Sequence, residues 1–402
     1  MRLVKLPLEF QKAKIILDKI CEAGFLAYFV GGSVRDTLLE LPLHDVDIAT
    51  SAYPAEIKHI FKKTIDTGIE HGTVTILDHG EGYEVTTFRT ESTYQDYRRP
   101  DSVKFVRSLA EDLKRRDLTI NALALNLDGE IIDLFNGLDD LKKKVIRAVG
   151  NPNERYHEDA LRMMRTVRFA SQLDFDIESK TLNAITTNSK LLKKIAVERI
   201  NVEWVKLLLG KNPKKGLQSF VDCGLYRYCP LLEDKEQILK LILSLDNLQI
   251  GDEVVAWTLF CYLSFQDYNK ITLFLKSWKC SNDLIARVER SFLATSLLKQ
   301  NQVNDWDLYT IGIQSFEIAN EVAKLLGFER DISIIRQNYE MLPIKNRKEL
   351  VINGGILIKE LDFVPGPFLG NILSKIEKKV VCGELPNELA VLKELALENK
   401  NN

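Results

Sequence analysis

Apolar positions along the chain follow two different periods, and the period changes near residue 145. Before that point, short runs alternate apolar and polar residues, which predicts strands, and helical spacing occurs between these runs. The pattern predicts an α+β or α/β domain of about five strands, with hairpin turns at 79–82 and 128–129. The strand-like runs are AYFV (27–30), DVDIAT (45–50), TVTILD (73–78), YEVTTF (83–88) and NALALNLDGEIID (121–133). The helical runs are Phe10–Cys21, the residues after Gly32, and PAEIKHIFKK (54–63).

After residue 145 the alternation fades, and segments rich in Leu, Lys and Glu carry helical spacing to the end of the chain. No repeat of fixed period and no low-complexity tract occurs. This part is therefore predicted to be all-helical, in several bundles. Its clearest segments are 156–175, 198–210, 235–248 and 370–380, with loops expected near 211–215, 246–252 and 343–347.

Length and composition indicate a globular protein with several domains. The chain has 402 residues, of which 45% are hydrophobic and 28% charged, and its formal net charge is −2. A chain of that length is too long to fold around one hydrophobic core of ordinary size. The net charge excludes a protein that is basic overall, but it does not exclude a local basic face. The first residues lack the apolar stretch of a signal peptide, and no apolar run of about 18 residues occurs, so no membrane span is expected.

Six cysteines and five histidines are scattered without the spacing of a metal site. We therefore expect no zinc site. The cysteines are expected to be reduced thiols, which predicts a cytoplasmic protein.

Two acids, Asp45 and Asp47, stand two apart in a run that is predicted to be a strand. Side chains alternate along a strand, so both carboxylates would project from one face. Adjacent carboxylates repel unless a cation lies between them, and Mg²⁺ prefers a few carboxylates completed by water and phosphate oxygens. A solvated strand end is the ordinary alternative. Glu84, on a later predicted strand, could supply a third acid to two metal ions or could simply face solvent.

Gly31 and Gly32 favour the metal interpretation, because they lie between a predicted strand and a predicted helix. Glycines there let a triphosphate approach the backbone, and the start of the helix offers free N–H groups. Arg35 could pair with phosphate oxygens, and Asp36 could orient Arg35 or cap the helix without a catalytic role. A tight turn is the alternative, and neither a dinucleotide fingerprint nor a P-loop is present.

Four segments in a fixed order carry a family resemblance. They are GGSVRD (31–36), DVD (45–47), KRRDLTINAL (114–123) and EDALRMMRTVRFA (158–170). In this order they resemble the class II tRNA nucleotidyltransferases, which include bacterial CCA-adding enzymes and poly(A) polymerases and belong to the polymerase-β-like superfamily. The likeness covers residues 20–175 without a departure from the motifs. It implies a seahorse-shaped protein with a catalytic head (1–145), a helical neck that selects the nucleotide (146–210), a helical body (211–300) and a helical tail that binds tRNA (301–402).

The resemblance also implies roles for single residues. Asp45 and Asp47 match the family's metal ligands, with Mg²⁺ as the implied cofactor, and Glu84 is the third catalytic acid considered. Asp159 and Arg162 match the pair that reads the base. The residues that match nucleotide-binding positions are Gly32, Arg35, Arg116, Asp159, Arg162, Arg165 and Arg168.

A physical argument also predicts that Asp159 and Arg162 read the base. Three residues apart on one helix, they would be neighbours. A carboxylate accepts hydrogen bonds and a guanidinium donates them, which complements the amine and ring nitrogen of cytosine and adenine and clashes with guanine and uracil. The same spacing predicts that Arg165 flanks Asp159 and that Arg168 lies nearly opposite it. An ordinary surface ion pair is the alternative.

The segment Arg89–Arg116 is long and polar, with eight Lys and Arg against five acids. It is predicted to be a functional loop and resembles the family's flexible loop, which serves addition of the final A; an ordinary surface loop is the alternative. Two further basic segments, 141–156 and 363–379, are candidates for contacts with RNA phosphates. The second has a predicted helix start at Gly366, followed by Lys375, Lys378 and Lys379.

These expectations describe a nucleotidyltransferase that adds and repairs the 3′-terminal CCA of tRNA. It would use CTP and ATP, release pyrophosphate, and recognise the 3′ end and the shape of the acceptor and T arms. The nearest alternative is a poly(A) polymerase, which the motifs do not separate from it. The intact Asp45 and Asp47 disfavour a catalytically inactive RNA-binding protein. The long helical remainder of the chain disfavours a nucleotidyltransferase that acts on small molecules. The sequence leaves open whether the chain forms a homodimer.

Overall fold

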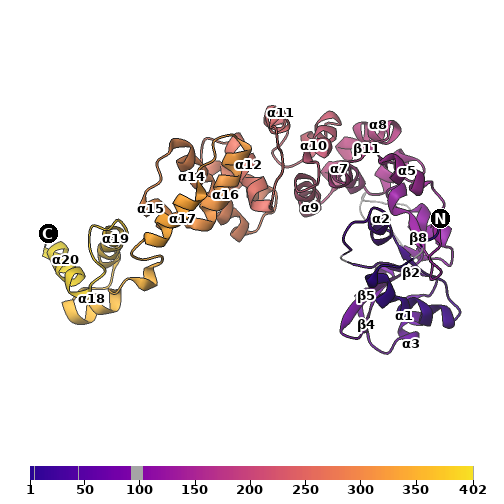
Figure 1. Cartoon of the computed structure of the whole chain (residues 1–402), viewed down its shortest axis with the longest axis horizontal. Coiled ribbons are helices and arrows are strands. Elements are labelled where there is room, and N and C mark those ends of the chain that lie inside the picture. Colours follow the sequence, from indigo (N-terminus) through magenta and orange to yellow (C-terminus); the bar gives the residue numbers. More distant parts are fainter. Residues whose placement is uncertain (4, 44, 92–102, 402) are drawn as a thin grey trace. The chain divides into compact units, whose positions relative to one another are not determined.

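The computed structural model describes residues 1–3, 5–43, 45–91 and 103–401, which divide into two compact units, Met1–Leu243 and Ser244–Asn402 (Figure 1). Each unit contains a hydrophobic core of its own. The finer division into head, neck, body and tail stays a prediction. The boundary between the two units falls inside the predicted body.

The first unit is built on a mixed seven-stranded sheet with the order β3-β4-β5-β2-β1-β8-β9. Only the β2–β5 pair is parallel among the pairs of this sheet in the described residues. The prediction of about five strands was too low, because the edge strand β3 is polar and mostly exposed and shows no apolar alternation. The strands are β1 Ala27–Val30, β2 Ile48–Thr50, β3 Thr64–Gly68, β4 Thr73–Asp78, β5 Glu81–Thr87, β8 Leu123–Leu125 and β9 Ile131–Asp133.

Alternation of side chains along the strands determines what each face of the sheet packs against. Phe29 and Ile48 join the main core, whereas their neighbours Val30 and Ala49 join a small cluster on the other face. Phe10 of α1 stacks on Phe29 with ring centroids 4.4 Å apart. The three helices predicted here are confirmed as α1 Leu8–Glu22, α2 Gly32–Leu38 and α3 Pro54–Ile60, and both predicted hairpins form.

The segment predicted as one long loop, Arg89–Arg116, is regular at both ends. Strands β6 (Arg89–Glu91) and β7 (Val103–Phe105) pair antiparallel, and helix α4 (Leu109–Lys114) follows. The prediction is wrong for these flanks: β6 and β7 pair through their backbones, and Ser108 caps α4 by accepting a hydrogen bond from the backbone N–H of Glu111. The middle of the predicted loop, 92–102, lies outside the described residues.

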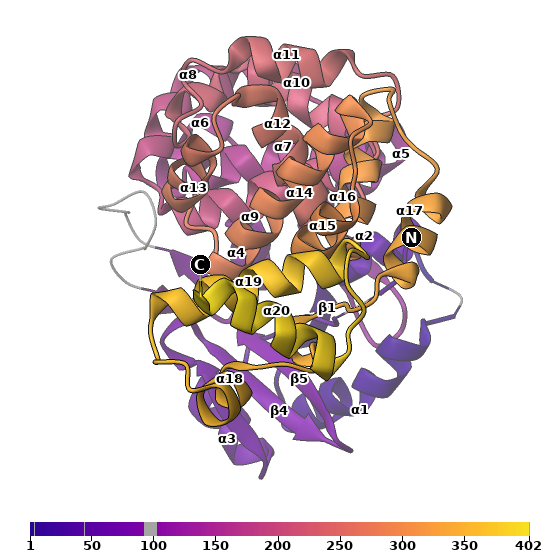
Figure 2. The same cartoon turned by 90° about the vertical axis from the view of Figure 1, so that its left-hand side faces the viewer.

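Beyond the sheet the first unit is mostly helical. Strands β10 (Val145–Ile146) and β11 (Asp176–Ile177) form a small parallel sheet, which the all-helical prediction missed because two-residue strands leave no pattern. Figures 1 and 2 show α1 and α3 with the large sheet at one end of this unit and α8 and α10 at the other. The helices are α5 Gly137–Lys143, α6 Pro152–Glu158, α7 Leu161–Leu173, α8 Ser179–Asn188, α9 Val197–Leu208, α10 Pro213–Asp222 and, at the boundary, α11 Glu236–Ser244.

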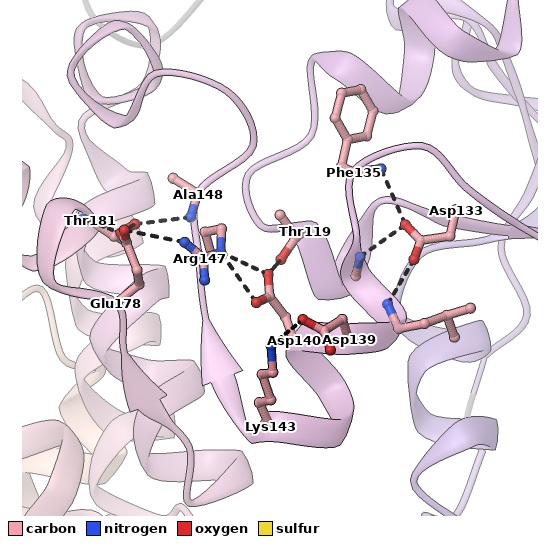
Figure 3. A network of polar contacts seen from close by, with 12 residues as sticks. Thr119, Asp133, Phe135, Asp139, Asp140, Lys143, Arg147, Ala148, Glu178 and Thr181 are labelled. Atoms are coloured by element: carbon pink, nitrogen blue, oxygen red, sulfur yellow. Dashed lines mark hydrogen bonds and ion pairs between the residues drawn. The ribbon is translucent and has the colours of Figure 1, made fainter.

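A polar network ties the short 3₁₀ helix η2 (Thr119–Asn121) to α5 and to the start of α8 (Figure 3). The buried carboxylate of Asp140 accepts hydrogen bonds from the Thr119 hydroxyl at 2.6 Å and from Nε of Arg147 at 3.1 Å. Arg147 also forms an ion pair with Glu178 at 3.2 Å. These contacts fix η2 in place beside the cleft described below.

The described residues of the second unit form helices joined by loops, without a strand. The loops predicted near 246–252 and 343–347 are confirmed, whereas the one near 211–215 is shorter because α10 already begins at Pro213. The helices are α12 Glu253–Ser264, α13 Asn269–Ser277, α14 Asn282–Gln300, α15 Asp305–Ile311, α16 Ile313–Leu325, α17 Ile332–Met341, α18 Gly354–Leu361, α19 Pro367–Val381 and α20 Leu389–Asn401.

Two general expectations can be checked over the described residues. None of their helices has both the length and the apolar character that crossing a bilayer requires. All six cysteines are free thiols, as predicted.

Candidate active site

The turn from β1 into α2 places two glycines at the edge of a cleft. Gly31 has φ +73°, a conformation that side chains disfavour, and a Cβ there would lie 2.8 Å from Nη1 of Arg116. Gly32 begins α2, and a Cβ on it would meet Nη2 of Arg35 at an ordinary 3.6 Å. The fold therefore requires glycine at 31, whereas glycine at 32 lines the cleft beside the first turn of α2 and would tolerate a Cβ.

Arg35 is buried in α2, and its guanidinium is fixed by two neighbours. Nε and Nη2 donate to the two carboxylate oxygens of Asp36 at 2.8 and 2.9 Å, and Nη1 donates to Oδ1 of Asn121 at 2.5 Å. The guanidinium also lies 4.9 Å from the ring centroid of Phe169. Asp36 thus orients Arg35, as predicted, and Asn121 is a partner that sequence analysis missed.

Asp45 and Asp47 stand just ahead of β2, so the observed strand is shorter than the predicted one. Pairing with β1 still reaches the carbonyl of Asp47. In the parallel register of β2 and β5, Ile48 lies beside Val85, so the residues before them, Asp47 and Glu84, are neighbours. Asp45, Asp47 and Glu84 all line one hollow, which places the three predicted acids together.

The charges of these acids act on one another. Desolvation by the surrounding protein raises the pKa of Asp47, although more than a third of this residue's surface stays exposed; the Arg116 charge opposes that rise, and the charges of Glu84 and Asp45 add to it. A cation would relieve this repulsion, so the residues fit a divalent metal ion. Across 1–91 and 103–401, leaving out residues 4 and 44, no three Asp, Glu, His or Cys side chains gather as closely as a metal site requires. A direct metal bond from Glu84 therefore stays a prediction.

Two hollows of opposite charge meet at Asp47. The first, here called the arginine cleft, has a volume of about 700 Å³ and is lined by eight arginines and four aspartates. The second, the acidic cleft, has about 720 Å³ and is lined by five acids and one lysine, Lys12. A triphosphate would be attracted to the first. The arginines are Arg35, Arg89, Arg115, Arg116, Arg162, Arg165, Arg168 and Arg199.

The Arg115–Asp117 segment connects α4 to the arginine cleft. The buried carboxylate of Asp112 contacts Arg115 at 2.7 Å and Arg116 at 3.2 Å. Asp117 contacts Arg165 of α7 at 2.7 Å. Burial alone would raise the pKa of Asp117, but the Arg165 charge and the hydrogen bonds that Asp117 accepts hold that pKa well below its usual range. Asp117 is therefore an anion that links this segment to α7.

Asp159 and Arg162 line the same cleft, but they are not neighbours on one helix and do not form the ion pair considered as the alternative. The expected single helix is broken, since α6 ends at Glu158 and α7 begins at Leu161, with Asp159 extended (φ −136°, ψ 105°). Oδ1 of Asp159 accepts from the backbone N–H of Leu161 at 3.0 Å, and Oδ2 accepts from Arg199 at 2.8 Å. Arg162 instead contacts Glu158 at 2.5 Å. An Asp side chain that bonds a nearby backbone N–H competes with helix continuation, which explains the break.

Arg162, Arg165 and Arg168 all project from α7 into the arginine cleft. The predicted position of Arg168 relative to Asp159 assumed one continuous helix, whereas Asp159 precedes α7 and lines the same cleft. Nε of Arg168 is 2.8 Å from Glu203, and its guanidinium lies 3.9 Å from the ring centroid of Phe169. Burial lowers the pKa of Arg168 to about 10, although Glu203 opposes the change. The predicted core contacts of α7 are confirmed as buried: Leu161, Met163, Met164, Val167 and Phe169.

Helix α9 supplies two site residues that sequence analysis missed. Arg199 reaches Asp159, and Glu203, one turn later on the same face, reaches Arg168. The sequence did contain a signal for these two residues: Arg199 and Glu203 carry opposite charges and stand four apart in a segment predicted to be helical. Such pairs are common on solvated helices, so this signal alone did not identify them.

The two basic segments have exposed lysines, as an RNA contact requires. Lys142, Lys143 and Lys144 are exposed at the end of α5. Lys375, Lys378 and Lys379 are exposed on α19, whose first residue follows Gly366. Their contact with RNA stays a prediction.

Three family models match consecutive parts of the chain. They are described as "Poly A polymerase head domain" at residues 27–147, "Probable RNA and SrmB- binding site of polymerase A" at 174–235, and tRNA nucleotidyltransferase domain 2 at 248–396. The first covers the sheet and both carboxylates Asp45 and Asp47. The third lies within the second unit.

Known proteins are similar along nearly the whole chain. The CCA-adding enzyme of Ligilactobacillus salivarius is 59% identical over 98% of this chain and 96% of its own, and that of Limosilactobacillus reuteri is 55% identical over 98% of each. The crystal structure of the Bacillus stearothermophilus CCA-adding enzyme in complex with CTP is 37% identical, covers 98% of this chain and 99% of its own, and superposes with a TM-score of 0.89. With this identity along both full lengths, the chain belongs to the CCA-adding enzyme family of tRNA nucleotidyltransferases.

Proposed function

We propose that the chain adds the 3′-terminal CCA of tRNA from CTP and ATP without a nucleic-acid template. The arginine cleft carries the proposal, because Asp47, Asp159 and Arg162 all line it. Similarity to the Bacillus stearothermophilus enzyme in complex with CTP supports CTP as a substrate. Poly(A) synthesis is not favoured, because the similar curated proteins bear the name CCA-adding enzyme.

The triphosphate would lie along the start of α2. The backbone beside Gly32 is open there, and Arg35 and Arg116 face the same cleft. Since Asp36 and Asn121 already hold Arg35, little reorganisation is needed when phosphate binds. The remaining arginines of the cleft would stabilise the negative charge that develops on the departing pyrophosphate.

The nucleotidyltransferase family uses a divalent metal ion, and we assign Asp45 and Asp47 as its ligands, with Mg²⁺ as the ion. When bound there, Mg²⁺ would neutralise phosphate charge and lower the pKa of the attacking hydroxyl. Glu84 would add its negative charge to the same place from β5.

The opposite charges of the two hollows give the two reactants separate approaches. The nucleoside triphosphate would occupy the arginine cleft. The 3′ hydroxyl of tRNA would arrive from the side of the acidic cleft, where metal ions held by Asp45 and Asp47 would offset the repulsion between these carboxylates and the RNA phosphates. This arrangement allows the hydroxyl to attack the α-phosphate opposite the leaving pyrophosphate.

Base selection would use Asp159 and Arg162 as separately held groups. Asp159 accepts from the exocyclic amine of cytosine or adenine, and Arg162 donates to the adjacent ring nitrogen. Guanine and uracil present the reverse pattern and would leave both groups unpaired.

The remaining assignments concern the RNA and the compartment. The exposed lysines of α5 and α19 would contact phosphates, which gives affinity for the shape of tRNA rather than its sequence. The free thiols suit the reducing cytoplasm, where we place the enzyme.

Sequencing of a reaction product tests the function. The protein is incubated with tRNA that lacks its 3′ end, Mg²⁺ and all four labelled nucleoside triphosphates. We expect addition of C, C and A by the natural chain and none by Asp47→Asn. A run of A would indicate a poly(A) polymerase, and absence of any incorporation by the natural chain would overturn the proposal.

A further inference from the structure

We propose that the start of α16, in the second unit, is a binding site for a phosphate group of the tRNA backbone. The site is a hollow of about 340 Å³ lined by residues of α14, α16 and α17, which lie side by side (Figure 1). This inference rests on the proposed function, because it takes tRNA as the substrate. None of the residues assigned above to the nucleotide, the metal ion or the RNA lines this hollow.

The first N–H groups of α16 have no partner in the part of the chain that the structure describes. Gly312 precedes the helix with φ +83° and ψ 145°, and it has no side chain that could cap the helix. The N–H groups of Ile313 and Gln314 donate to no carbonyl or side chain among the described residues. Such groups, together with the dipole of a 13-residue helix, attract an anion.

A hydroxyl group in the same hollow is an independent sign of a ligand. Ser315, in the first turn of α16, is only 6% exposed and lines the hollow. Its Oγ makes no hydrogen bond to any described residue. A nearly buried hydroxyl without a partner is unfavourable. A phosphate oxygen in the hollow would accept a hydrogen bond from Ser315 and remove that cost.

Two arginines of α14 supply positive charge. Arg287 and Arg290 are exposed, line the hollow and stand three residues apart, so they are neighbours on the helix surface. Neither is paired with a carboxylate of the described residues, whereas Arg336 of α17 is paired with Glu317 at 2.6 Å. Of the described residues that line the hollow, only Asp283 is acidic. Two guanidinium groups and a helix start outweigh that one charge, and they suit a phosphodiester.

The kind of contact favours a phosphate within RNA. Exposed guanidinium groups beside a hydroxyl and free N–H groups hold the backbone of a strand without reading its sequence. An enzyme that serves many tRNAs needs contacts of this kind. The family model for tRNA nucleotidyltransferase domain 2, at residues 248–396, includes every residue of the site. Free inorganic phosphate has the same chemistry, so the test must separate the two sources.

Three variants of the full chain test the inference. A double variant, Arg287→Gln with Arg290→Gln, removes both charges, and Ser315→Ala removes the hydroxyl. Arg336→Gln is the matched control, because that charge is already paired with Glu317. We expect the Kd for tRNA, measured by filter binding, to rise about tenfold or more in the double variant, about fivefold in Ser315→Ala and less than about twofold in the control. The slope of log Kd against log salt concentration should fall by about two in the double variant.

Ethylation of single tRNA phosphates locates the contact. With the natural chain, ethylation at one or two positions should weaken binding, and the double variant should lose its sensitivity at those positions. The KM for CTP should not change, because the arginine cleft belongs to the first unit. Natural tRNA affinity in both site variants would overturn the inference, and so would undiminished sensitivity to ethylation in the double variant.

Inorganic phosphate distinguishes the two sources of the ligand. If phosphate raises the melting temperature of the natural chain while the site variants bind tRNA normally, the hollow holds a free ion and the inference is overturned. The same melting curves show whether each variant folds, and the double variant changes only exposed side chains, so it tests the inference if Ser315→Ala does not fold. Failure of the natural chain to add CCA would overturn the proposed function, whereas weaker tRNA binding by the site variants would still support this site.

Discussion

Glu203 of α9 lies 2.8 Å from Arg168 of α7, and both side chains are less than a tenth exposed. The two atoms are close without the alignment of a hydrogen bond, so the contact is chiefly a charge interaction. Glu203→Gln would leave the buried Arg168 cation without its counter-charge. We expect a loss of about 3 kcal/mol in the free energy of unfolding, measured by urea denaturation.

An exposed ion pair of the same unit provides the control. Lys58 and Asp66 are 2.9 Å apart, but both side chains are more than two-fifths exposed. Water and salt screen such a pair, so Asp66→Asn should cost less than about 1 kcal/mol. Equal losses in the two variants would show that burial of Glu203 and Arg168 does not matter.

The adjacent glycines provide a second prediction, because their backbones differ. Gly31→Ala places a side chain at φ +73° and against Arg116, so we expect it to cost about 1–3 kcal/mol of stability and to displace Arg116. Gly32→Ala fits inside α2, where alanine is a good helix former. It should fold normally but weaken binding of nucleoside triphosphate, since the added methyl group occupies the space beside the helix start.

Melting temperature and nucleotide titration of both variants check this difference. If Gly32→Ala binds CTP as well as the natural chain, the phosphate does not approach the backbone at that point. A stable Gly31→Ala variant would contradict the conformational argument.

Most of the part of the first unit that contains the large sheet could be predicted, because its signals are local. Gly31, Arg35, Asp45 and Asp47 lie within one short stretch, and the strands around them alternate clearly. β3 escaped prediction because an exposed edge strand carries no apolar alternation. The two-residue strands β10 and β11 are stabilised by a pairing between distant segments, which no local pattern contains.

The partners of the site residues could not be predicted in the same way. Asn121 bonds Arg35 across 86 positions, and Arg199 bonds Asp159 across 40, so the fold alone brings them together. The break between α6 and α7 had a local cause, the capping side chain of Asp159. Helical spacing continues through that break, and so the periodicity concealed it.

Charge repulsion at Asp47 predicts opposite effects on stability and activity. Desolvation and the neighbouring acids raise the pKa of Asp47 in the folded chain, so its ionisation destabilises the metal-free protein, by a small amount because the residue is partly exposed. Asp47→Asn removes that charge. We expect a higher melting temperature than the natural chain at pH 7 without metal, and a loss of activity of about a thousandfold or more, since the proposed metal ligand is lost.

The pH dependence gives the sign of this effect. The pKa of Asp47 is about 3.9 in the unfolded chain and higher in the folded chain. The folded protein is therefore destabilised progressively as the pH rises from the first of these values through the second. The stability gained by Asp47→Asn should therefore vanish below about pH 4. Added Mg²⁺ should raise the melting temperature of the natural chain more than that of the variant, and equal shifts would argue against Asp47 as a ligand.

Asp117 predicts the opposite pH dependence, because its pKa is lowered in the folded chain. The Arg165 charge and accepted hydrogen bonds outweigh the effect of burial on this pKa, so the ionised form of Asp117 is stabilised by folding.

Its contribution is complete above the unfolded pKa, about 3.9, and is lost as pH falls through the lower folded pKa. Asp117→Asn should cost about 2 kcal/mol at neutral pH, a value reduced by the partial exposure of Arg165. Urea denaturation at pH 7, 5 and 3 measures the difference. It should be the same at pH 7 and 5, smaller at pH 3 and smaller still in stronger acid. A difference that already shrinks between pH 7 and 5 would mean that Asp117 is not held as an anion by Arg165.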